Sequence, residues 1–373
     1  MKIGVFHPSL YNFGGGEFVA LVVVNSLASN GHEVELLTSK KIKQDLVKRM
    51  MGEQIASSVK MIFQPSYTHP SGSFDLFPTA LYSLVLKSKC DILVDTYSNC
   101  VFPWTDICYI HFPFLNRNDY SKVFPYLKHR HVRNLLGLPY LLYARKIQNY
   151  KNKLIIANSQ FTADSIKEFT DADVKVIYPP VSSNSFRQSP FKRCDASRED
   201  LIVTVSRFSK DKKLEIIPYI AKQTEREVRF VIIGLLHDQK VYEALIKSVK
   251  KLGLTEKVKI MLNAPKKELE DLLGRAKIYL HTTPQEHFGI SIVEAMASGC
   301  IPITHNSGGM MEFVPDRYRY EDLQDAVIKI NSAMHEWRPQ VAEDMFRIAQ
   351  QFSEYNFSKN FIEIFSSYVE QRR

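Results

Sequence analysis

The stretch from Thr282 to Gly299 reads TTPQEHFGISIVEAMASG. It follows a short apolar run at residues 278–281, which is typical of a buried strand, and it passes into helical spacing near Gly289. A strand that ends in a polar loop and then enters a helix is the repeating unit of a parallel α/β sheet. The stretch therefore predicts that the domain around it is doubly wound.

Two carboxylates of this stretch, Glu286 and Glu294, lie on either side of the predicted helix start. Glu286 precedes the helix, where it can reach a substrate, and Glu294 lies about one turn inside it. The N–H groups near Phe288, Gly289 and Ile290 would face an anion, with the helix dipole behind them. Spacing alone leaves a structural alternative open, in which Glu286 caps the helix and Glu294 is a surface charge.

The same alternation of strands and helices extends along the chain. A helix is predicted from Gly15 to Asn30, and Gly31 is a suitable C-terminal stop for it. Short apolar runs predict strands at residues 2–7, 33–38, 91–95, 107–111, 154–158 and 174–178, and then at 201–205, 229–233, 258–262, 278–281 and 301–304.

Residues 178–184, which read YPPVSSN, separate the two series of strands. Two prolines and a polar run make a stiff connector, and 373 residues are too many for one ordinary core. The predicted fold class is α/β, with two Rossmann-like, doubly wound parallel-sheet domains and a hinge near residue 180. Ligands bind such sheets at the carboxyl ends of the strands, so we expect the loops there to carry the site.

Composition limits the class of protein. Hydrophobic residues make up 45% and charged residues 24%, which is the balance of a folded chain and not of a disordered one. The net charge of +9 suits phosphate-rich partners, namely nucleotides, anionic lipid or nucleic acid, although basic surfaces are also common without any partner. The five cysteines form no C-x-x-C pair, so we expect reduced thiols in a cytosolic protein and no structural zinc.

Targeting segments are not expected either. The N-terminus runs directly into the first predicted strand, so we expect no signal peptide. No stretch reaches the roughly 18 apolar residues of a membrane-spanning helix.

Two further loops follow the first strand of each predicted domain. Residues 14–16 are three glycines, which allow close approach of the backbone to a ligand, but they form neither G-x-G-x-x-G nor a P-loop, and a tight strand-to-helix turn is an equal alternative. Residues 206–212 read SRFSKDK. Arg207 and Lys212 suit a diphosphate, because arginine grips oxygens in a fork and lysine acts as a point charge. A solvated basic turn is the other interpretation.

Together these motifs resemble retaining GT-B glycosyltransferases of family 4. The pair Glu286 and Glu294 looks like the E-x7-E motif of that family, and Arg207 with Lys212 resembles its R…K diphosphate pair. Residues 14–16 resemble its N-terminal glycine loop, and the runs at residues 158–162 and 176–181 match in order and place. The resemblance covers nearly the whole chain, and several motifs in the correct order are far more specific than any one of them.

A narrower likeness is carried by residues 109–113, 286–290 and 305–309. They are similar to the α-1,2-mannosyltransferases that extend lipid-linked oligosaccharides from GDP-mannose. Those enzymes usually carry an N-terminal membrane anchor, which is not expected here, and after Gly309 this chain reads MMEFV, nearer the general family pattern. The resemblance implies transfer of a hexose, mannose from GDP-mannose, to a lipid-linked or other glycan acceptor. A UDP-sugar carrying glucose or N-acetylglucosamine is the alternative donor.

The resemblance also implies roles for single residues. Arg207 and Lys212 would neutralise the leaving diphosphate, so no metal would be required, and Glu294 would hold the ribose hydroxyls. Glu286 would hydrogen-bond the transferred sugar near its reacting face, with backbone contacts to sugar and phosphate. Those backbone contacts would come from Phe288, Gly289 and Ile290.

In the first domain, the resemblance gives His111 a contact with the donor sugar or the acceptor. A satisfied structural histidine is the alternative for this residue. Gly15 and Gly16 would approach the diphosphate or the acceptor when the domains close around the cleft between them. The resemblance divides the chain into an acceptor domain, residues 1–180, with a C-terminal helix at 356–373 packing back on it, and a donor domain, residues 181–355.

The region from residue 117 to 153 concentrates basic charge. It contains nine lysines and arginines against the single acid Asp119, with tyrosines and a phenylalanine between them. Basic and aromatic residues together suit an anionic membrane interface or a polyprenyl diphosphate head group. We therefore predict a cytoplasmic protein that is peripheral at the cytoplasmic face of a membrane. An ordinary solvated face is the alternative, and no recognised nucleic-acid module is present.

Three rival functions are weighed against this interpretation. A metal-dependent GT-A transferase would need a D-x-D motif, and residues 171–173 fit its letters, but they lie between a helix and the following strand, which predicts a surface turn. A nucleotide-sugar epimerase and a non-catalytic nucleotide- or RNA-binding protein are the others. An assay without acceptor tests the epimerase, and Glu286→Ala tests the binding protein.

Overall fold

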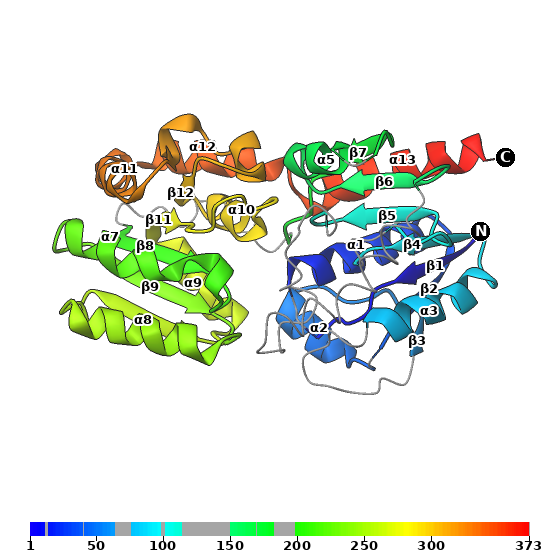
Figure 1. Ribbon diagram of the computed structural model, residues 1–373, viewed down its shortest axis with the longest axis horizontal. Coiled ribbons are helices and arrows are strands. Elements are labelled where there is room, and N and C mark those ends of the chain that lie inside the picture. Colours follow the sequence, from blue (N-terminus) through cyan, green and yellow to red (C-terminus); the bar gives the residue numbers. More distant parts are fainter. Residues whose placement is uncertain are drawn as a thin grey trace. The chain divides into compact units, whose positions relative to one another are not determined.

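The computed structural model describes residues 1–11, 14–39, 41–63, 76–97, 101–113, 150–168, 170–182 and 198–372. It contains two compact units (Figure 1). Unit 1 comprises Met1–Pro180 and Tyr355–Arg373, and unit 2 comprises Val181–Glu354.

Unit 1 is built on a seven-stranded sheet in the order β3-β2-β1-β4-β5-β6-β7, and every neighbouring pair is parallel. Its strands are β1 (Lys2–Phe6), β2 (Glu33–Thr38), β3 (Lys60–Phe63), β4 (Ile92–Asp95), β5 (Ile107–Ile110), β6 (Leu154–Ala157) and β7 (Val174–Val176). Its described helices are α1 (Gly15–Ser29), α2 (Gln44–Met51), α3 (Leu76–Lys87), α5 (Gln160–Lys167) and α13 (Glu354–Gln371), the last of which enters the unit from the end of unit 2.

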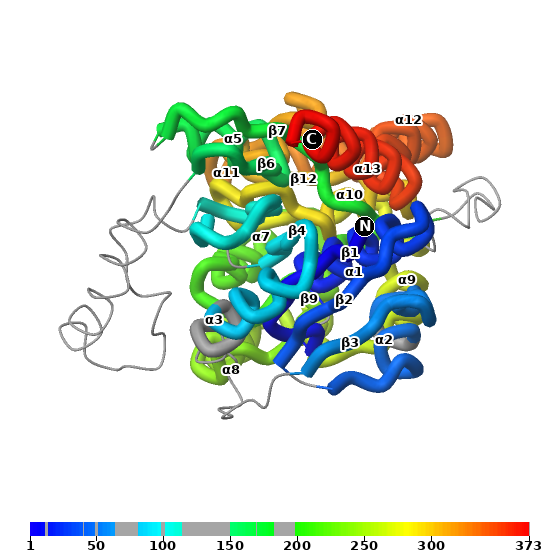
Figure 2. Tube along the Cα trace, turned by 90° about the vertical axis from the view of Figure 1, so that its right-hand side faces the viewer, coloured from blue at the N-terminus to red at the C-terminus, as the bar shows by residue number. Residues whose placement is uncertain are grey.

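Helix α13 belongs to the core of unit 1 because of its aromatic spacing. Phe357, Phe361 and Phe365 recur every four residues, so they share one face of the helix, and all three are buried with Ile3 and Val5 of β1. Their rings stack on one another at centroid distances of 6.0 and 6.2 Å. The hydroxyls of Ser26 on α1 and Ser358 on α13 are hydrogen-bonded at 2.8 Å, so the two helices lie against each other (Figure 2).

Unit 2 is built on a six-stranded sheet in the order β10-β9-β8-β11-β12-β13, again parallel throughout. Its strands are β8 (Glu199–Val205), β9 (Arg229–Gly234), β10 (Val258–Leu262), β11 (Ala276–Leu280), β12 (Ile301–His305) and β13 (Arg319–Tyr320). Its described helices are η4 (Lys210–Lys212), η5 (Leu214–Ile216), α7 (Ile217–Gln223), α8 (Gln239–Lys251), α9 (Lys266–Arg275), α10 (Ile290–Ala297), η6 (Gly309–Glu312), η7 (Asp316–Tyr318), α11 (Leu323–Glu336) and α12 (Pro339–Gln350).

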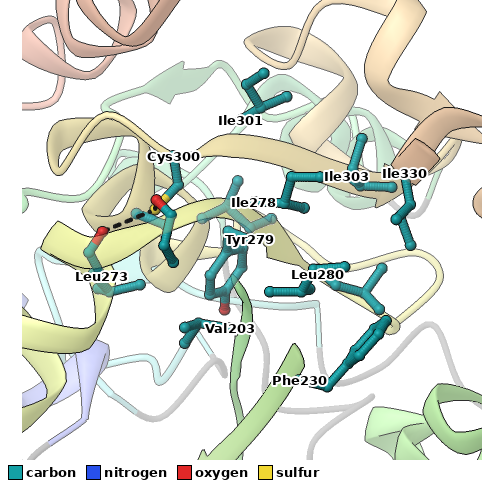
Figure 3. Close-up of a cluster of buried hydrophobic side chains, with 14 of the residues drawn as sticks. Val203, Phe230, Leu273, Ile278, Tyr279, Leu280, Cys300, Ile301, Ile303 and Ile330 are labelled. Carbon is teal, nitrogen blue, oxygen red and sulfur yellow. Dashed lines mark hydrogen bonds between the residues drawn. The ribbon is translucent and has the colours of Figure 1, made fainter. Parts of the chain in front are cut away.

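The centre of the unit 2 core lies where β11 passes between its neighbours. Ile278 and Leu280 from β11 pack with Val203 of β8, Ile303 of β12 and Ile330 of α11, and all five side chains are fully buried (Figure 3). Continuous apolar strands of this kind are expected when helices cover both faces of a parallel sheet. The rigid core fixes where the polar residues that follow β8 and β11 emerge.

Both sheets reverse their winding at an equivalent place. The chain builds outward from β1 to β3 and then crosses to β4 on the other side of β1, and it does the same from β8 to β10 and then to β11. The loops that follow the two central strands diverge at such a switch point, and ligands bind there in open α/β sheets. In unit 1 these loops follow β1 and β4, and in unit 2 they follow β8 and β11.

The predicted strands are confirmed to within two residues at each end, and α1 begins at Gly15 as expected, with Gly31 in the left-handed conformation just after it. Two strands were missed. Strand β3 is a half-buried edge strand of four residues, and β13 has only two residues, so neither carries an apolar run long enough to recognise.

Two further features concern the described helices and cysteines. None of the helices described in the structure is long and apolar enough to cross a bilayer. Cys90, Cys108 and Cys300 are free thiols, while Cys100 and Cys194 lie outside the described residues.

The first prediction concerns the contribution of α13 to unit 1. Phe361→Ala should lower the free energy of unfolding of this unit by about 3–5 kcal/mol, because it removes a ring that is 0% exposed from a closed core. The exposed Lys359→Ala on the same helix is the control and should change it by less than about 0.5 kcal/mol. Urea denaturation measures both values, and equal effects of the two substitutions would contradict the packing.

Candidate functional site

The loop after β8 is held close to the sheet by a glycine and a buried aromatic ring. A Cβ at Gly234, the last residue of β9, would lie 1.6 Å from the carbonyl oxygen of Ser206, so only glycine permits the loop to cross there. The amide of Phe208 donates to Leu235 at 3.0 Å, and its ring is fully buried. This anchoring leaves Arg207 exposed, and its side chain forms no hydrogen bond or ion pair with any other described residue.

Lys212, at the end of η4, forms an ion pair with Glu286 from the loop after β11. The distance from Lys212 Nζ to Glu286 Oε2 is 2.6 Å, and the two side chains are only 15% and 21% exposed. The hydroxyl of Thr282 donates to the backbone carbonyl of Lys212 at 2.6 Å, which fastens η4 to the end of β11. The two predicted site residues from the loops after β8 and β11 are therefore in direct contact.

The backbone of Glu286 is clamped by the loop after β12. The amide of Gly309 donates to the Glu286 carbonyl at 2.8 Å, and the hydroxyl of Ser307 accepts from the amide of Gln285 at 2.8 Å. Gly308 has φ +82°, and a Cβ there would lie 2.4 Å from the Glu286 oxygen and 2.8 Å from its nitrogen. A glycine at this position is required for the two loops to meet.

His281 contacts the same carboxylate from the end of β11. Its Nε2 lies 3.5 Å from Glu286 Oε2, and the side chain is almost fully buried. The hydroxyl of Tyr320 on β13 donates to the His281 carbonyl at 3.1 Å and fixes its backbone. Burial lowers the pKa of His281, and the neighbouring carboxylate of Glu286 only partly opposes this effect, so the imidazole is neutral at physiological pH.

The electrostatics of Glu286 follow from these contacts. Burial alone would raise the pKa of its carboxyl group, but the attraction of Lys212 and the nearby imidazole of His281 outweigh burial. The pKa of Glu286 therefore lies well below its usual range, and the group is a carboxylate that can accept hydrogen bonds.

Helix α10 begins directly after this carboxylate. Its N-cap is Gly289, with φ +91° and no side chain to bond the first N–H groups of the helix. The first N–H groups of any helix lack intrahelical acceptors and carry the positive end of the dipole, so this end suits an anion. The ring of Phe288 is buried against Phe313 and Phe352, so this residue has only its backbone to offer a ligand.

Glu294 is half-buried on α10, one turn inside the helix as predicted from the sequence. Burial raises the pKa of its carboxyl group, and Glu270 adds to the increase while Lys266 opposes it. No described residue forms an ion pair or a hydrogen bond with the Glu294 side chain. The structural alternative in which Glu286 caps the helix is wrong, because α10 has no side-chain cap.

In unit 1, residues after β1, β4 and β5 meet at the switch point. Nε2 of His111 lies 3.0 Å from the carbonyl oxygen of Thr96, which can only accept, so His111 carries its proton on Nε2. Nδ1 of His7 lies 2.9 Å from the hydroxyl of Thr96, which itself donates to the Phe6 carbonyl at 3.2 Å. Because the Thr96 hydroxyl uses its only proton for the Phe6 carbonyl, it must accept from His7, and His7 therefore carries its proton on Nδ1.

Both histidines are neutral at physiological pH. Burial lowers the pKa of His7 to about 3, with a further contribution from His111, and burial lowers the pKa of His111 to about 4. The amide of Asn158 at the end of β6 donates to the His111 carbonyl at 2.9 Å and fixes its backbone. His111 is thus a neutral, oriented imidazole at a strand end.

The glycine loop borders this histidine. A Cβ at Gly16 would lie 3.4 Å from Nε2 of His111, so the first turn of α1 lies directly against the ring. The amide of Gly14 donates to the carboxylate of Glu17 at 3.0 Å, which closes the N-terminus of α1. Gly15 and Gly16 therefore lie beside His111, whereas residues 12 and 13 lie outside the described part of the chain.

Comparison with known proteins gives a family for each half of the chain. Residues 13–185 match the family described as Glycosyltransferase Family 4, and residues 186–350 match Glycosyl transferases group 1. This chain is a GT-B glycosyltransferase. The two matched segments meet close to the boundary between the two units.

Relatives of known name extend over almost the full length of the glycosyltransferase. A protein of Dictyostelium discoideum named GDP-Man:Man(3)GlcNAc(2)-PP-Dol alpha-1,2-mannosyltransferase is 24% identical, over 100% of this chain and 85% of the relative. The protein of the same name in Xenopus tropicalis is 27% identical, over 96% of this chain and 86% of the relative.

Solved structures show the same fold. HepE of Anabaena in complex with UDP-glucose superposes with a TM-score of 0.72 at 18% identity, over 98% of this chain and 100% of that chain. Sucrose-phosphate synthase of Thermosynechococcus elongatus gives a TM-score of 0.73 at 13% identity, over 100% of both chains.

Other sequence predictions have mixed outcomes. Asp171 and Asp173 are exposed between α5 and β7, and Asp173 pairs with Lys175 at 2.8 Å, so they lie on the surface as expected, in an irregular connection rather than a turn. Within the described residues, no group of three or more histidine, cysteine or acidic side chains could hold a metal ion.

The basic region from residue 117 to 153 lies outside the described residues up to residue 149. Lys153, at its end, differs from the predicted exposed cation. It is half-buried, and its amine donates to the carbonyls of Pro103 and Thr105. Burial lowers the pKa of this lysine.

Several residues that surround Glu286 in unit 2 or meet at Thr96 in unit 1 were not singled out from the sequence. His7, Thr96 and His281 each follow a buried strand, and that position at a switch point is the signal that could have identified them. Gly308 was noticed only through the resemblance, since its contact with Glu286 spans two loops.

The second prediction tests the close approach at Gly308. Gly308→Ala should lower the rate of sugar transfer by about tenfold or more, because the new Cβ must displace the backbone of Glu286. Gly253→Ala is the matched control, since Gly253 also has a positive φ of +69° but nothing lies within 4 Å of its would-be Cβ. Gly253→Ala should lose about 1 kcal/mol of stability from backbone strain. Gly308→Ala should lose more, because its φ of +82° and ψ of −169° are nearly exclusive to glycine and its Cβ meets backbone atoms, and only Gly308→Ala should lose activity. Unchanged transfer in Gly308→Ala would contradict the clamp.

The third prediction concerns the pH dependence of stability. Between about pH 6.5 and pH 4, the unfolded chain protonates His7 whereas the folded unit does not, so the unfolded state binds more protons and stability falls as the pH falls. His7→Gln should reduce this slope by about 1.4 kcal/mol per pH unit. The exposed His237→Gln serves as the control. Denaturation curves across this range measure the slope, and an unchanged slope in His7→Gln would refute the assignment.

Proposed function

We propose that this glycosyltransferase moves mannose, with retention, from GDP-mannose to a lipid-linked glycan at the cytoplasmic face of a membrane. The observation that carries the proposal is the contact between Lys212 and Glu286 beside the uncapped start of α10. A cation, a carboxylate and a helix start that suits an anion lie together at the switch point of this sheet, and they support the proposal. The relatives of Dictyostelium discoideum and Xenopus tropicalis, which match nearly the whole chain, bear a name that specifies GDP-mannose and a dolichol-linked acceptor.

On the donor side, Arg207 and Lys212 would bind the diphosphate, and the amides of residues 288–290 would add hydrogen bonds to phosphate and sugar. Negative charge grows on the leaving diphosphate in the transition state, so fixed cations and a helix N-terminus stabilise that state more than the bound substrate. We propose that this set replaces a metal ion. Transfer that persists in EDTA would support the proposal, and loss of transfer in EDTA would overturn this part of it.

The two carboxylates would recognise the sugars of the donor. Glu286 is ionised and partly buried, so it can accept hydrogen bonds from hydroxyls of the transferred mannose, and Glu294 would hold the ribose hydroxyls. A carboxylate near the reacting carbon also stabilises the positive charge of an oxocarbenium-like transition state. For that reason Glu286 should matter more for the rate constant than for binding of the nucleotide.

On the acceptor side, unit 1 would present Gly15, Gly16 and His111. The His111 ring is neutral and has a fixed tautomer, which suits hydrogen bonding to a hydroxyl rather than ion pairing. The region from residue 117 to 153 would hold the protein against anionic lipid, where a lipid-linked acceptor lies. Sedimentation with anionic and neutral vesicles measures this contact.

The fourth prediction identifies the donor. GDP, UDP and ADP are added separately, each alone and as its sugar nucleotide, and the melting temperature is followed. A nucleotide at about 100 times its dissociation constant stabilises the fold by about 2.7 kcal/mol, so GDP and GDP-mannose should shift the melt and the others should not. A shift with UDP compounds alone would assign the donor to UDP-sugars.

Transfer assays with site variants complete this test. Glu286→Ala and Lys212→Ala should abolish transfer from GDP-mannose while the circular dichroism spectrum stays that of the folded protein. Lys213→Ala, at an exposed neighbouring lysine, is the matched control and should retain transfer. Full activity in either site variant would refute the site, and no shift with any nucleotide would refute the proposed function.

A further inference from the structure

The proposed function gives Lys212 and Glu286 different parts of the donor, yet in the structure without ligand they bind each other. Nζ of Lys212 and Oε2 of Glu286 are 2.6 Å apart, which is a short charge-assisted hydrogen bond. Two mostly buried charges must each be compensated when no ligand is present. In that state the carboxylate of Glu286 takes the place that the diphosphate would take at Lys212.

We infer that Glu286 competes with the donor diphosphate for Lys212, and that His281 is a positioning residue which holds Glu286 when Lys212 turns to the diphosphate. This inference rests on the proposed function, since it concerns the same donor site. Beyond the proposed function, the inference states that Lys212 exchanges Glu286 for the diphosphate when the donor binds, and that His281 takes part in this exchange.

The competition follows from the geometry around Glu286. Its backbone is clamped by Gly308 and Gly309, so the carboxylate cannot follow the ligand over a long distance. Lys212 has a long, flexible side chain, whereas its backbone carbonyl is fixed by Thr282. The lysine amine is therefore the part that can move between the carboxylate and a phosphate oxygen.

His281 is the group that can compensate Glu286 once the lysine has moved. Its Nε2 is buried, finds no hydrogen-bond partner among the described residues and lies 3.5 Å from Glu286 Oε2, slightly beyond ordinary hydrogen-bond distance. A neutral imidazole protonated on Nε2 can donate to the carboxylate after a small rotation. No proton needs to be transferred in this exchange.

The consequence is a preference for the sugar nucleotide over the bare nucleotide. A donor with its sugar gives Glu286 new hydroxyl partners in return for Lys212, but the nucleoside diphosphate left after transfer does not. Glu286 then competes for Lys212 again, which speeds release of the product. Release of product limits the turnover of many enzymes, so this competition would act on the rate.

The first experiment measures the affinity for GDP, and for UDP in parallel, by isothermal titration calorimetry. Glu286→Gln keeps the shape of the side chain but frees Lys212, so it should tighten GDP binding by about tenfold, the usual value of one charge-assisted hydrogen bond. The matched variant Glu294→Gln removes the same charge from the same segment, and it should weaken GDP binding because it loses a ribose contact.

A double-mutant cycle separates the exchange from a general effect of charge. In a Lys212→Met background, Glu286→Gln should change GDP affinity by less than about twofold. Tightening of the same size with and without the lysine would overturn the inference, as would unchanged or weaker binding in Glu286→Gln alone. If the wild type binds neither GDP nor UDP, the proposed function itself fails, so the two failures are distinguishable.

The second experiment tests His281 through the pH profile of kcat. The ionisable groups that interact with Glu286 are Lys212 of η4, His281 at the end of β11 and Tyr279 of β11. Glu294 of α10 also acts on Tyr279. Removing a hydrogen-bond donor from a buried carboxylate raises its pKa, so His281→Leu should move the acid limb of kcat to higher pH. His281→Gln, which supplies an amide N–H near the position of Nε2, should restore the limb toward the wild type.

A merely structural role for His281 predicts a different result. In that case both variants would lower thermal stability and kcat together, with an acid limb at the wild-type pH. An unshifted limb in folded His281→Leu, or a limb in His281→Gln shifted as far as in His281→Leu, would overturn the role of His281. The melting temperature of each variant is measured first, so that the profiles compare folded proteins.

Discussion

The ion pair between Lys212 and Glu286 is the interaction on which the arrangement of the loops at the switch point of unit 2 depends. Each partner comes from a loop at the carboxyl end of a central strand, and the pair joins these loops across the switch point of the sheet. Neither charge is well solvated, so either one left alone would be costly. The pair thus holds the two loops together in the absence of ligand and keeps the cation at the place where the proposed function puts the diphosphate.

Local backbone features make this contact possible. The glycines at 234 and 308 each allow two backbones to approach more closely than any side chain would permit, one below the loop that carries Lys212 and the other beside Glu286. Gly289 adopts a left-handed conformation that starts α10 without a capping side chain. These three glycines fix the path of the backbone around the site. They therefore fix the points from which the side chains of Lys212 and Glu286 extend.

The sequence predicted the fold class and most strands, because parallel sheets covered on both faces produce apolar runs that are easy to recognise. It also singled out Glu286 and Lys212, which the structure brings into contact, although only the resemblance gives these two charged loop residues a proposed role. The partners of these residues could not be predicted in this way. His281 looks like the last residue of an apolar strand, and its contact with Glu286 depends on a loop folding back, which no local spacing records. The packing of α13 on unit 1 could not be predicted from spacing either. Its aromatic spacing predicts a buried face, but it does not say which residues cover that face.

The two units handle charge at their switch points in opposite ways. Unit 1 places two neutral histidines there, with low pKa values imposed by burial and with tautomers fixed by Thr96. Unit 2 places a cation there and neutralises it with Glu286. A site that binds a highly charged diphosphate needs a permanent cation, and that cation needs a counter-charge when the site is empty. A site that binds sugar hydroxyls needs only oriented hydrogen bonds, for which a neutral imidazole is sufficient. The proposed function, with a charged donor bound by unit 2 and an uncharged acceptor hydroxyl bound by unit 1, would account for this distribution of charge.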